Sequence, residues 1–331
     1  MKDLWIGEKM ENLLTIVIPT YNRKERLART LKLLENQTYK NFNLVILDNN
    51  SDYKISDLLK NYSGNFLQKI ELVSNKFNIG MTGNICNSFL HVKTKWLWIL
   101  ADDDIVHSTA VEIIYDNIVD NNSYILHFSP YNENDENDLD QKIYTLPEYI
   151  EFFNKYGNNK SNYLKMKNYS IFLSSYIFNM DKCSQYAHYA FEYSYTNIPS
   201  LVVVLKILDD QKGCLQWFNK KFIDYDRANG DQWNTSEVTL GLRTISDISF
   251  SLTKKLNKDL VRIIMFSFDK AIYFSLNAKN QKEFLKKLYS DVYKYTLKNY
   301  EKIIYMVAVI FSNQKYFFSN ILKKIYNFYL K

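Results

Sequence analysis

Four short apolar segments near the start of the chain, separated by helical patterns, restrict the fold more than any other feature. They are rich in branched and aromatic residues and cover residues 14–19, 43–47, 70–73 and 96–100. The segments between them carry apolar residues at three- and four-residue spacing, which is typical of helices. Since strands buried on both faces read as nearly continuous apolar runs, this order predicts an α/β fold with a mostly parallel sheet flanked by helices.

The rest of the chain continues the pattern and then becomes helical. Shorter strands are predicted within residues 125–129, 169–179 and 222–225. From about Val238 onward, apolar positions repeat at helical spacing almost throughout. We therefore predict two units, an α/β domain over residues 1–235 and a helical C-terminal region over residues 236–331.

Composition excludes several classes of protein. With 47% apolar and 24% charged residues, the chain has a globular rather than a disordered composition. Cys86, Cys183 and Cys214 are widely spaced and form no CxxC pair, which argues against disulfide or zinc frameworks. Residues 1–14 have no apolar core typical of a signal peptide, and the apolar run 303–311 is far shorter than the roughly 20 residues of a membrane span. We therefore expect a cytoplasmic location.

Charge is distributed unevenly along the chain. The net charge is +6, yet residues 251–331 hold 16 Lys and Arg against 5 Asp and Glu. The chain ends in the basic, aromatic sequence KYFFSNILKKIYNFYLK. Such a helix suits peripheral attachment to an anionic membrane face. The alternative is a helical bundle with an aromatic core, which would also allow two chains to pair as a homodimer. No nucleic-acid-binding motif accompanies the charge, so no nucleic-acid partner is expected.

The strongest chemical signal is the triplet Asp102, Asp103 and Asp104, directly after the fourth apolar segment. Neighbouring carboxylates repel one another unless a cation or strong hydrogen-bond donors neutralise them. Ligands of parallel sheets bind beyond the carboxyl ends of the strands, where this triplet would lie. Its oxygens suit Mg²⁺ or Mn²⁺ that arrives with a diphosphate. The alternative is a solvated acidic turn that caps the helix beginning near Val111.

Polar clusters also follow the first and second apolar segments. In the sequence PTYNR at residues 19–23, the Tyr21 ring suits stacking on a base and the Arg23 guanidinium suits a phosphate. Asp48 opens the cluster DNNSD, where its carboxylate would accept an N–H from a base. Read alone, each cluster is also explained as a turn, with Asn22 capping the following helix or with Asx turns in the second cluster.

A fourth cluster, the sequence NIGMTGN, precedes the third predicted helix. Gly80 permits a positive φ and a close approach of the backbone to a ligand. Amides that enter the start of a helix favour phosphate. The segment matches neither the GxGxxG nor the GxxxxGK[ST] pattern, so Rossmann dinucleotide sites and P-loops are not expected.

In this order, PTYNRKE, Asp48 with Ser51, NIGMTGN and LADDD resemble the inverting nucleotide-sugar glycosyltransferases of family 2, which have the GT-A fold. The resemblance is strongest to the bacterial O-antigen and capsule transferases of the abequosyltransferase-like group. It covers residues 14–110 well, 111–235 loosely and the remainder hardly at all. It implies a metal-dependent transfer from a nucleotide-diphosphate sugar donor to a saccharide or polyprenyl-linked saccharide acceptor, in the synthesis of a surface polysaccharide.

The resemblance also implies a role for individual residues. Pro19, Thr20 and Tyr21 would line the base and Asp48 would bond to it, Asn78, Gly80 and Asn84 would shape the pocket, and Asp102 and Asp103 would lie near the ribose and diphosphate. Asp104, helped by Asp102, would hold Mn²⁺ or Mg²⁺. Gln232 and Trp233 would stand where the family's C-terminal lid touches the diphosphate, and Arg23 would complete the nucleotide-sugar site.

The catalytic base departs from the family pattern. The family often places it in a Glu-Asp pair just before a helix, and here residues 196–199 read TNIP, with no acid. An inverting transfer needs one group to take the proton of the acceptor hydroxyl. The candidates are Asp231, in the loop NGDQW, and Glu192, in the Tyr-rich segment YAFEYSY. His188 is a weaker candidate. The other histidines are expected to be structural.

Two other functions stay open at this point. A sugar nucleotidyltransferase would share a similar sheet, but it requires a Gly-rich first loop. Residues 19–26 contain no Gly, which counts against this function. A GT-A-like protein that has lost its base would act as a binding protein instead, and the missing acid at residues 196–198 favours it.

Overall fold

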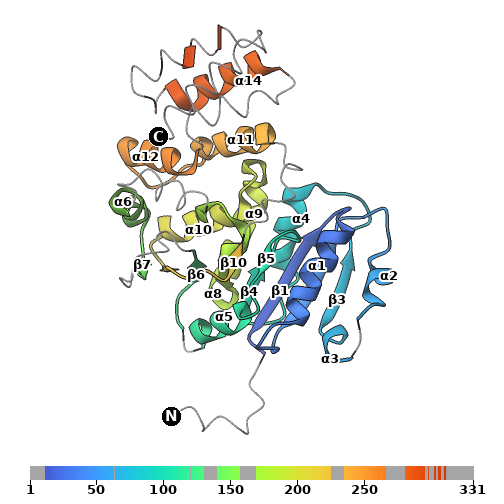
Figure 1. Ribbon diagram of the computed structural model, residues 1–331. Helices are drawn as coiled ribbons and strands as arrows, with labels where there is room; N and C mark the ends of the chain where they lie inside the picture. Colours follow the sequence, from blue (N-terminus) through green and yellow to red (C-terminus); the bar gives the residue numbers. More distant parts are fainter. Residues whose placement is uncertain are drawn as a thin grey trace, which may run out of the picture.

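The computed structural model describes residues 12–62, 64–119, 121–129, 140–156, 169–224, 235–265 and 280–294, and a few residues between 297 and 310. Within these stretches, one eight-stranded sheet runs through the molecule with helices on both faces (Figure 1). The predicted α/β class is therefore confirmed.

The strands of this sheet follow the spatial order β3-β2-β1-β4-β8-β6-β9-β7. Their bounds are β1 Leu14–Thr20, β2 Asn43–Asp48, β3 Ile70–Ser74, β4 Trp96–Ile99, β6 Ile125–Phe128, β7 Gln141–Ile143, β8 Tyr176–Asn179 and β9 Leu215–Phe218. A separate two-stranded ribbon pairs β5 (Ile105–Val106) with β10 (Ile223–Asp224) in antiparallel fashion.

The first four strands form a parallel unit, as their unbroken apolar runs predict. β1 lies between β2 and β4, and β3 pairs with the outer edge of β2, all in parallel. Ile16 and Ile18 face one helical layer and Val17 faces the other, and all three are fully buried. Because β1 is central, the residues after it lie between those that follow β2 and β4.

An antiparallel strand interrupts the parallel order. β8 pairs with β4 on one side and with β6 on the other, antiparallel to both. Beyond it, β6 and β9 are again parallel, and β7 closes the sheet antiparallel to β9. The sheet is thus mostly parallel, as expected, but it consists of two parallel groups of strands, β3-β2-β1-β4 and β6-β9, which are joined through the antiparallel strand β8.

Helices cover the two faces of the sheet and bury separate apolar cores. The described helices of the α/β part are α1 Lys24–Glu35, α2 Ile55–Leu59, α3 Gly64–Leu67, α4 Met81–Asn87, α5 Ala110–Ile118, α6 Leu146–Tyr156, α8 Met180–Cys183, α9 His188–Glu192 and α10 Pro199–Asp209, with short turns η1 Ser88–Leu90, η2 Leu173–Ser175, η3 Ser184–Tyr186 and η4 Ser194–Thr196. One core joins α1, α2 and α5 to the sheet, and the other joins α4, α6 and α10 to the opposite face. Both faces are therefore closed to solvent, as a parallel sheet requires.

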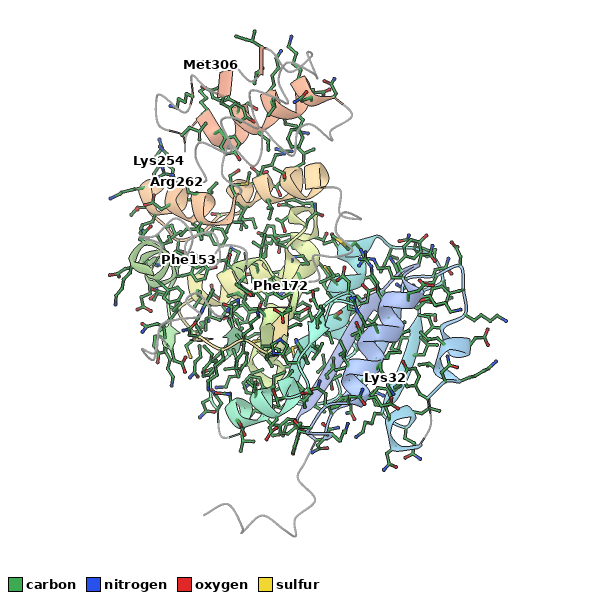
Figure 2. All side chains as sticks on the ribbon, in the orientation of Figure 1. Lys32, Phe153, Phe172, Lys254, Arg262 and Met306 are labelled. Atoms are coloured by element: carbon green, nitrogen blue, oxygen red, sulfur yellow. The ribbon has the colours of Figure 1, made fainter. Side chains whose placement is uncertain are left out.

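The described part of the C-terminal region is helical, as predicted. It comprises α11 Thr235–Arg243, η5 Thr244–Asp247, α12 Lys254–Ile264, α14 Gln281–Leu288 and η6 Tyr289–Tyr293. Figure 1 shows α11 and α12 over the side of the α/β part that carries α6, α9 and α10, with α14 beyond them. Figure 2 shows Lys254 and Arg262 on α12, where both side chains are exposed, whereas Phe153 of α6 is fully buried. Among the described helices, none combines the length and the apolar character that crossing a bilayer requires. The basic, aromatic end of the chain, residues 315–331, lies outside the described residues.

Candidate functional site

The ends of three neighbouring strands bring the first predicted residues together. The register of β1 and β2 pairs Thr20 with Asp48, and the Asn49 amide donates to the Thr20 carbonyl at 2.9 Å. On the other side of β1, the Thr20 hydroxyl donates to Oδ2 of Asp102 at 2.6 Å. The polar clusters after the first, second and fourth strands therefore share one edge of the sheet, as predicted.

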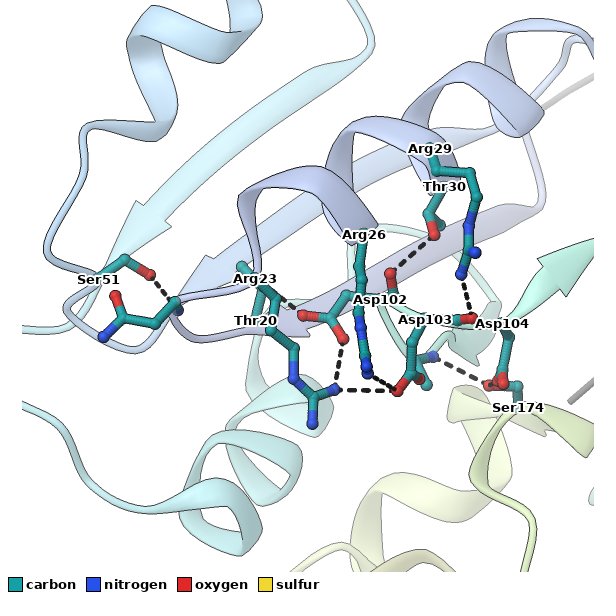
Figure 3. A network of polar contacts seen from close by, with 12 residues as sticks. Thr20, Arg23, Arg26, Arg29, Thr30, Ser51, Asp102, Asp103, Asp104 and Ser174 are labelled. Atoms are coloured by element: carbon teal, nitrogen blue, oxygen red, sulfur yellow. Dashed lines mark hydrogen bonds and ion pairs between the residues drawn. The ribbon is translucent and has the colours of Figure 1, made fainter. Parts of the chain in front are cut away.

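Two arginines neutralise the first two aspartates of the triplet. Nη1 of Arg23 contacts Oδ1 of Asp102 at 2.8 Å and Oδ2 of Asp103 at 3.2 Å. Nη1 of Arg26 reaches the same Asp103 oxygen at 2.9 Å. Figure 3 shows both side chains extending from the α1 end of the site toward the acidic turn. Burial lowers the pKa of Arg23, but the carboxylates of Asp102 and Asp103 outweigh it, and the net pKa shift is upward.

The backbone of the acidic turn is also held by α1. Nη2 of Arg29 donates to the Asp103 carbonyl at 2.6 Å, and the Thr30 hydroxyl donates to the Asp102 carbonyl at 2.9 Å. Arg23, Arg26 and Arg29 are spaced three residues apart and lie along one side of the helix. This face of α1 therefore binds both the side chains and the backbone carbonyls of the acidic turn.

Asp104 points away from the arginines and is bound from the second half of the sheet. The Ser174 hydroxyl donates to its Oδ2 at 2.6 Å and accepts from the Ala101 amide at 2.9 Å. Nε1 of Trp98 donates to the Ser174 carbonyl at 2.8 Å. Burial raises the pKa of Asp104 well above its ordinary value, and the neighbouring aspartates add to the shift. Sequence reasoning missed Ser174, which lies 70 residues away.

The alternative of a solvated acidic turn is wrong. Asp102, Asp103 and Asp104 are 2%, 8% and 1% exposed. The helix that follows, α5, begins after Thr109 and has no side-chain cap. Burial also raises the pKa of Asp102, although Arg23 and Thr20 reduce the shift. Buried carboxylates of this kind need bound cations or donors, and Arg23, Arg26 and Ser174 are among the groups that supply them.

The Asn49 side chain organises the loop before α4. Its Nδ2 donates to Oδ1 of Asn78 at 2.7 Å and to the Gly80 carbonyl at 3.2 Å. Its Oδ1 accepts from Asn75 and from the Ile79 amide, each at 3.0 Å. Asn49 is 2% exposed. An amide can both donate and accept here, which a carboxylate cannot.

Gly80 and Asn84 lie on either side of the start of α4. This helix begins at Met81, inside the NIGMTGN sequence that was expected to precede it. Gly80 has φ 81° and ψ 160°, a conformation that only glycine adopts readily, and its amide donates to Asn78 at 2.8 Å. Asn84 is buried, where it donates to the Leu47 carbonyl at 2.9 Å. Asn84 therefore links α4 to the end of β2.

Two tyrosines flank this edge of the sheet. Tyr21 is 39% exposed, and Pro19 precedes it within β1. Tyr53, which sequence reasoning missed, has a buried hydroxyl with no hydrogen-bond partner among the described residues. Burial raises its pKa to about 12, and the nearby carboxylates of Asp48 and Asp102 add to the shift. Asp48 itself accepts from the Ser51 amide at 2.9 Å, which is the Asx turn that its cluster suggested.

The candidate bases are placed only in part. Glu192 ends α9 and is exposed, and its hydrogen bond to the Tyr193 hydroxyl is the main cause that raises the pKa of Tyr193 to about 12. The next segment contacts the start of α4, because the Thr82 hydroxyl donates to Oδ1 of Asn197 at 3.1 Å. His188 is exposed and bonds to its own turn. Asp231, Gln232 and Trp233 lie outside the described residues.

The acidic turn fits a divalent cation by its chemistry. All its side-chain donors are carboxylate oxygens, which Mg²⁺ and Mn²⁺ prefer. Arg23 already places one positive charge between Asp102 and Asp103. Within the described stretches, however, no three His, Cys, Asp or Glu side chains converge as a metal site does. Asp102 faces Arg23, and Asp104 faces Ser174 instead.

Comparison with solved structures shows the class of fold. A crystal structure of the TarS fragment from Staphylococcus aureus superposes with a TM-score of 0.55 at 12% identity, over 83% of this chain and 79% of that one. The same fragment in complex with UDP-GlcNAc gives a TM-score of 0.51 at 12% identity, over 89% of this chain and 79% of that one. These are GT-A glycosyltransferases, and the fold described above is of the GT-A type, as expected.

Comparison of sequences then gives the family. Residues 15–184 match the profile of glycosyl transferase family 2, and since this is more than half of the chain, the chain belongs to that family. The expected class, a glycosyltransferase, is confirmed at this level.

Two curated relatives share part of this sequence. Poly(ribitol-phosphate) beta-N-acetylglucosaminyltransferase TarP from Staphylococcus aureus strain N315 is 28% identical over 116 residues, which are 34% of this chain and 35% of TarP. GalNAc(5)-diNAcBac-PP-undecaprenol beta-1,3-glucosyltransferase from Campylobacter jejuni is 24% identical over 101 residues, 30% of this chain and 33% of the relative. The chain thus matches about a third of the length of these relatives.

Proposed function

We propose that this chain transfers a sugar from a nucleotide-diphosphate donor to a saccharide acceptor. The observation that supports it is the cluster of Thr20, Arg23 and Asp102 at the ends of β1 and β4, with Asp48 at the end of β2. Charged and polar groups of this kind, at the carboxyl edge of a parallel sheet, suit a nucleotide. The family to which the chain belongs supports the same reaction class.

The nucleotide would lie across these strand ends. Tyr21, with its exposed ring, would stack on the base beside Pro19 and Thr20, and Asp48 would accept an N–H from it. Asn78 and Gly80, held by Asn49, would form the adjoining wall with Asn84 behind them. Asp102 and Asp103 would face the ribose and diphosphate, with Arg23 beside them, and Gln232 and Trp233 are proposed as further diphosphate contacts.

The proposed cofactor is Mn²⁺ or Mg²⁺, held by Asp104 with help from Asp102. When bound, such a cation stabilises the charge on the departing diphosphate. Thr20 orients Asp102 for this role and Ser174 orients Asp104. Arg26 and Arg29 hold the turn in position from α1.

Glu192 and Asp231 are proposed as alternative catalytic bases for an inverting transfer. The base would take the proton of the acceptor hydroxyl as the bond to the anomeric carbon forms. Glu192 is exposed and ends α9, which packs against α4. A Glu192→Gln variant that keeps donor binding but loses transfer would identify it as the base, and full transfer by this variant would favour Asp231.

We also propose the kind of acceptor and the kind of polymer that the reaction serves. The acceptor would be a polyprenyl-linked saccharide, and the reaction would serve the synthesis of a surface polysaccharide (capsule or O-antigen) by an abequosyltransferase-like enzyme. The named acceptor of the Campylobacter jejuni relative, a GalNAc(5)-diNAcBac-PP-undecaprenol, supports a lipid-linked acceptor. We propose a cytoplasmic location, a catalytic domain over residues 1–235, and a region over residues 236–331 that contacts the membrane face or a second copy.

Calorimetry with UDP, GDP, CDP and dTDP, each with and without Mn²⁺, tests the donor assignment. UDP comes first, because TarS was solved with UDP-GlcNAc. We expect one nucleotide to bind only with the metal, and Asp104→Ala to lose this binding while it stays folded. Asp57→Ala is the matched control, since Asp57 is an exposed aspartate on α2. No nucleotide binding by the wild type would favour the alternative of a binding protein without donor chemistry.

A further inference from the structure

We propose that Arg23 is the resident cation of the donor site and that it exchanges its place for the metal when the donor binds. As a result, the divalent cation and the nucleoside diphosphate would bind cooperatively, each weakly alone and both tightly together. This inference rests on the proposed function, because it concerns the same donor site. It adds a role for Arg23 that differs from the roles of the two arginines that follow it on α1.

Arg23 occupies the position beside Oδ1 of Asp102, the aspartate that the proposed metal site would share with Asp104. A single nitrogen, Nη1, bridges Asp102 at 2.8 Å and Asp103 at 3.2 Å (Figure 3). The carboxyl groups of these two residues are only 3% and 11% exposed, so they depend on a positive partner. The oxygen that Arg23 binds on Asp102 is Oδ1, whereas Thr20 holds Oδ2. When Arg23 leaves, Asp102 therefore keeps its orientation and presents Oδ1 to the incoming cation.

Arg26 and Arg29 hold the turn whether or not Arg23 is present. Arg26 contacts Asp103 at 2.9 Å, and Arg29 binds the Asp103 carbonyl at 2.6 Å. Both belong to the first two turns of α1, whereas Arg23 precedes the helix, with φ −126° and ψ 51°. The Arg23 side chain is 22% exposed, against 16% for Arg26. Arg23 thus combines partial exposure with a contact to both carboxylates.

The energetic consequence is a coupling between the two ligands. A metal ion that binds alone must displace Arg23 and leave a partly buried guanidinium without its carboxylate partners, which opposes binding. A diphosphate gives that guanidinium a new anionic partner, to which it forms strong charge-assisted hydrogen bonds. Since coupling between two ligands is reciprocal, the metal also strengthens the binding of the nucleotide by the same factor.

The test compares metal binding with and without nucleotide in wild type and in two variants. Titrations measure the affinity for Mn²⁺ alone, for UDP alone, and for UDP at saturating Mn²⁺, corrected for the complex that Mn²⁺ and UDP form in buffer. In the wild type we expect Mn²⁺ to strengthen UDP binding by about tenfold or more. In Arg23→Gln, Mn²⁺ alone should bind several-fold more tightly than to the wild type, and the coupling factor should fall toward one.

Lys32→Gln is the matched control, because it removes one positive charge from the exposed side of the same helix. It should leave both the Mn²⁺ affinity and the coupling unchanged. Arg26→Gln should not combine a rise in Mn²⁺ affinity with a loss of coupling, since its ion pair is with Asp103 and leaves the bond between Arg23 and Oδ1 of Asp102 in place. Mn²⁺ affinity in Arg23→Gln that equals or falls below the wild-type value would overturn the exchange.

Two further measurements test whether Arg23 exchanges with the metal. If Arg23→Gln does not fold, Arg23→Lys keeps the charge but loses the planar fork, and it should show the same changes to a smaller degree. In the wild type, side-chain ¹⁵N spectra should show the Arg23 guanidinium losing its carboxylate contacts when Mg²⁺ and UDP are added together, and an unchanged signal would contradict the exchange. Absence of UDP binding to the wild type under any condition would instead refute the proposed donor, while the Mn²⁺ titrations still test the exchange.

Discussion

The Thr20 hydroxyl donates a 2.6 Å hydrogen bond to Oδ2 of Asp102, and this bond joins the ends of β1 and β4. Both residues are nearly fully buried, at 3% and 2% exposed. Hydrogen bonds to charged groups are stronger than those between neutral groups, and a lost donor leaves a buried carboxylate short of a partner. The orientation of Asp102 thus depends on a residue 82 positions earlier in the chain.

We predict that Thr20→Val weakens the binding of UDP in the presence of Mn²⁺ by about tenfold to a hundredfold, given about 1.5–3 kcal/mol for a hydrogen bond to a charged group. Valine has nearly the same shape but cannot donate to Asp102. Thr20→Ser keeps the hydroxyl and should bind UDP almost as the wild type does. Isothermal titration of both variants measures the difference, and equal affinities would mean that Arg23 alone orients Asp102.

A second prediction concerns the amide of Asn49. Asn49→Asp keeps the size of the side chain but loses the donor that reaches Asn78 and the Gly80 carbonyl. A carboxylate facing these two oxygens should lower the free energy of unfolding by about 1–3 kcal/mol and weaken UDP binding. Asn50→Asp is the control, since Asn50 is exposed and its φ of 66° is tolerated by Asp. Urea unfolding compares the two, and equal losses would contradict the role of Asn49.

The third prediction concerns the close contact between α11 and the segment before α10. A Cβ at Gly241 would overlap the Asn197 amide and come within 2.9 Å of the Thr196 carbonyl. Gly241→Ala should therefore lower the midpoint of thermal unfolding and disturb the bond between Asn197 and Thr82. Gly83→Ala, also in a helix, meets only ordinary contacts with Ile79, and alanine should stabilise it by about 0.4–1 kcal/mol. A midpoint for Gly241→Ala at or above the wild-type value would contradict the contact.

The fourth prediction follows from the buried imidazole of His127. Burial lowers its pKa to about 3, from an ordinary value of 6.5. The unfolded chain therefore binds a proton here below about pH 6.5, whereas the folded chain does so only near pH 3. The stability linked to His127 is fully present above pH 6.5 and is lost as the pH falls toward 3. At pH 5 this loss amounts to about 2 kcal/mol.

Urea unfolding at pH 7 and pH 5 measures this effect. In His127→Phe, the drop in unfolding free energy between the two pH values should be smaller than in the wild type by about 2 kcal/mol. His188→Gln, a substitution of an exposed histidine, should keep the wild-type drop. If His127→Phe loses as much stability on acidification as the wild type, another group is responsible for the pH dependence.

The parallel part of the sheet was predictable because its strands are unbroken apolar runs that end in polar clusters. Those clusters follow the strand ends, which is why Thr20, Asp48 and Asp102 could be placed at one edge of the sheet from the sequence alone. The placement of β8 between β4 and β6 was not predicted. Its residues read as a strand, but the choice of neighbours depends on how distant segments pack, and a short apolar run carries no such information.

The partners of the acidic turn were predicted only in part. Ser174 stands in a stretch of small and aromatic residues that gives no sign of its bond to Asp104. The sequence does carry a pattern that indicates the arginines. In RKERLAR, Arg23, Arg26 and Arg29 recur every third residue, which places them on one side of a helix. Combined with the acidic triplet at the adjacent strand end, this spacing predicts contacts between the three arginines and the acidic turn.

The antiparallel strand β8 also sets the timing of folding during synthesis. β4 ends at Ile99, and the strand that covers its free edge starts only at Tyr176. At roughly 5–20 residues per second, the ribosome needs roughly 4–15 seconds to make the intervening chain. During that interval the nascent parallel unit presents the open, apolar edge of β4, a surface prone to pairing with other chains. Messages truncated within this interval should yield aggregating products, and the cell has to protect every new copy until β8 emerges.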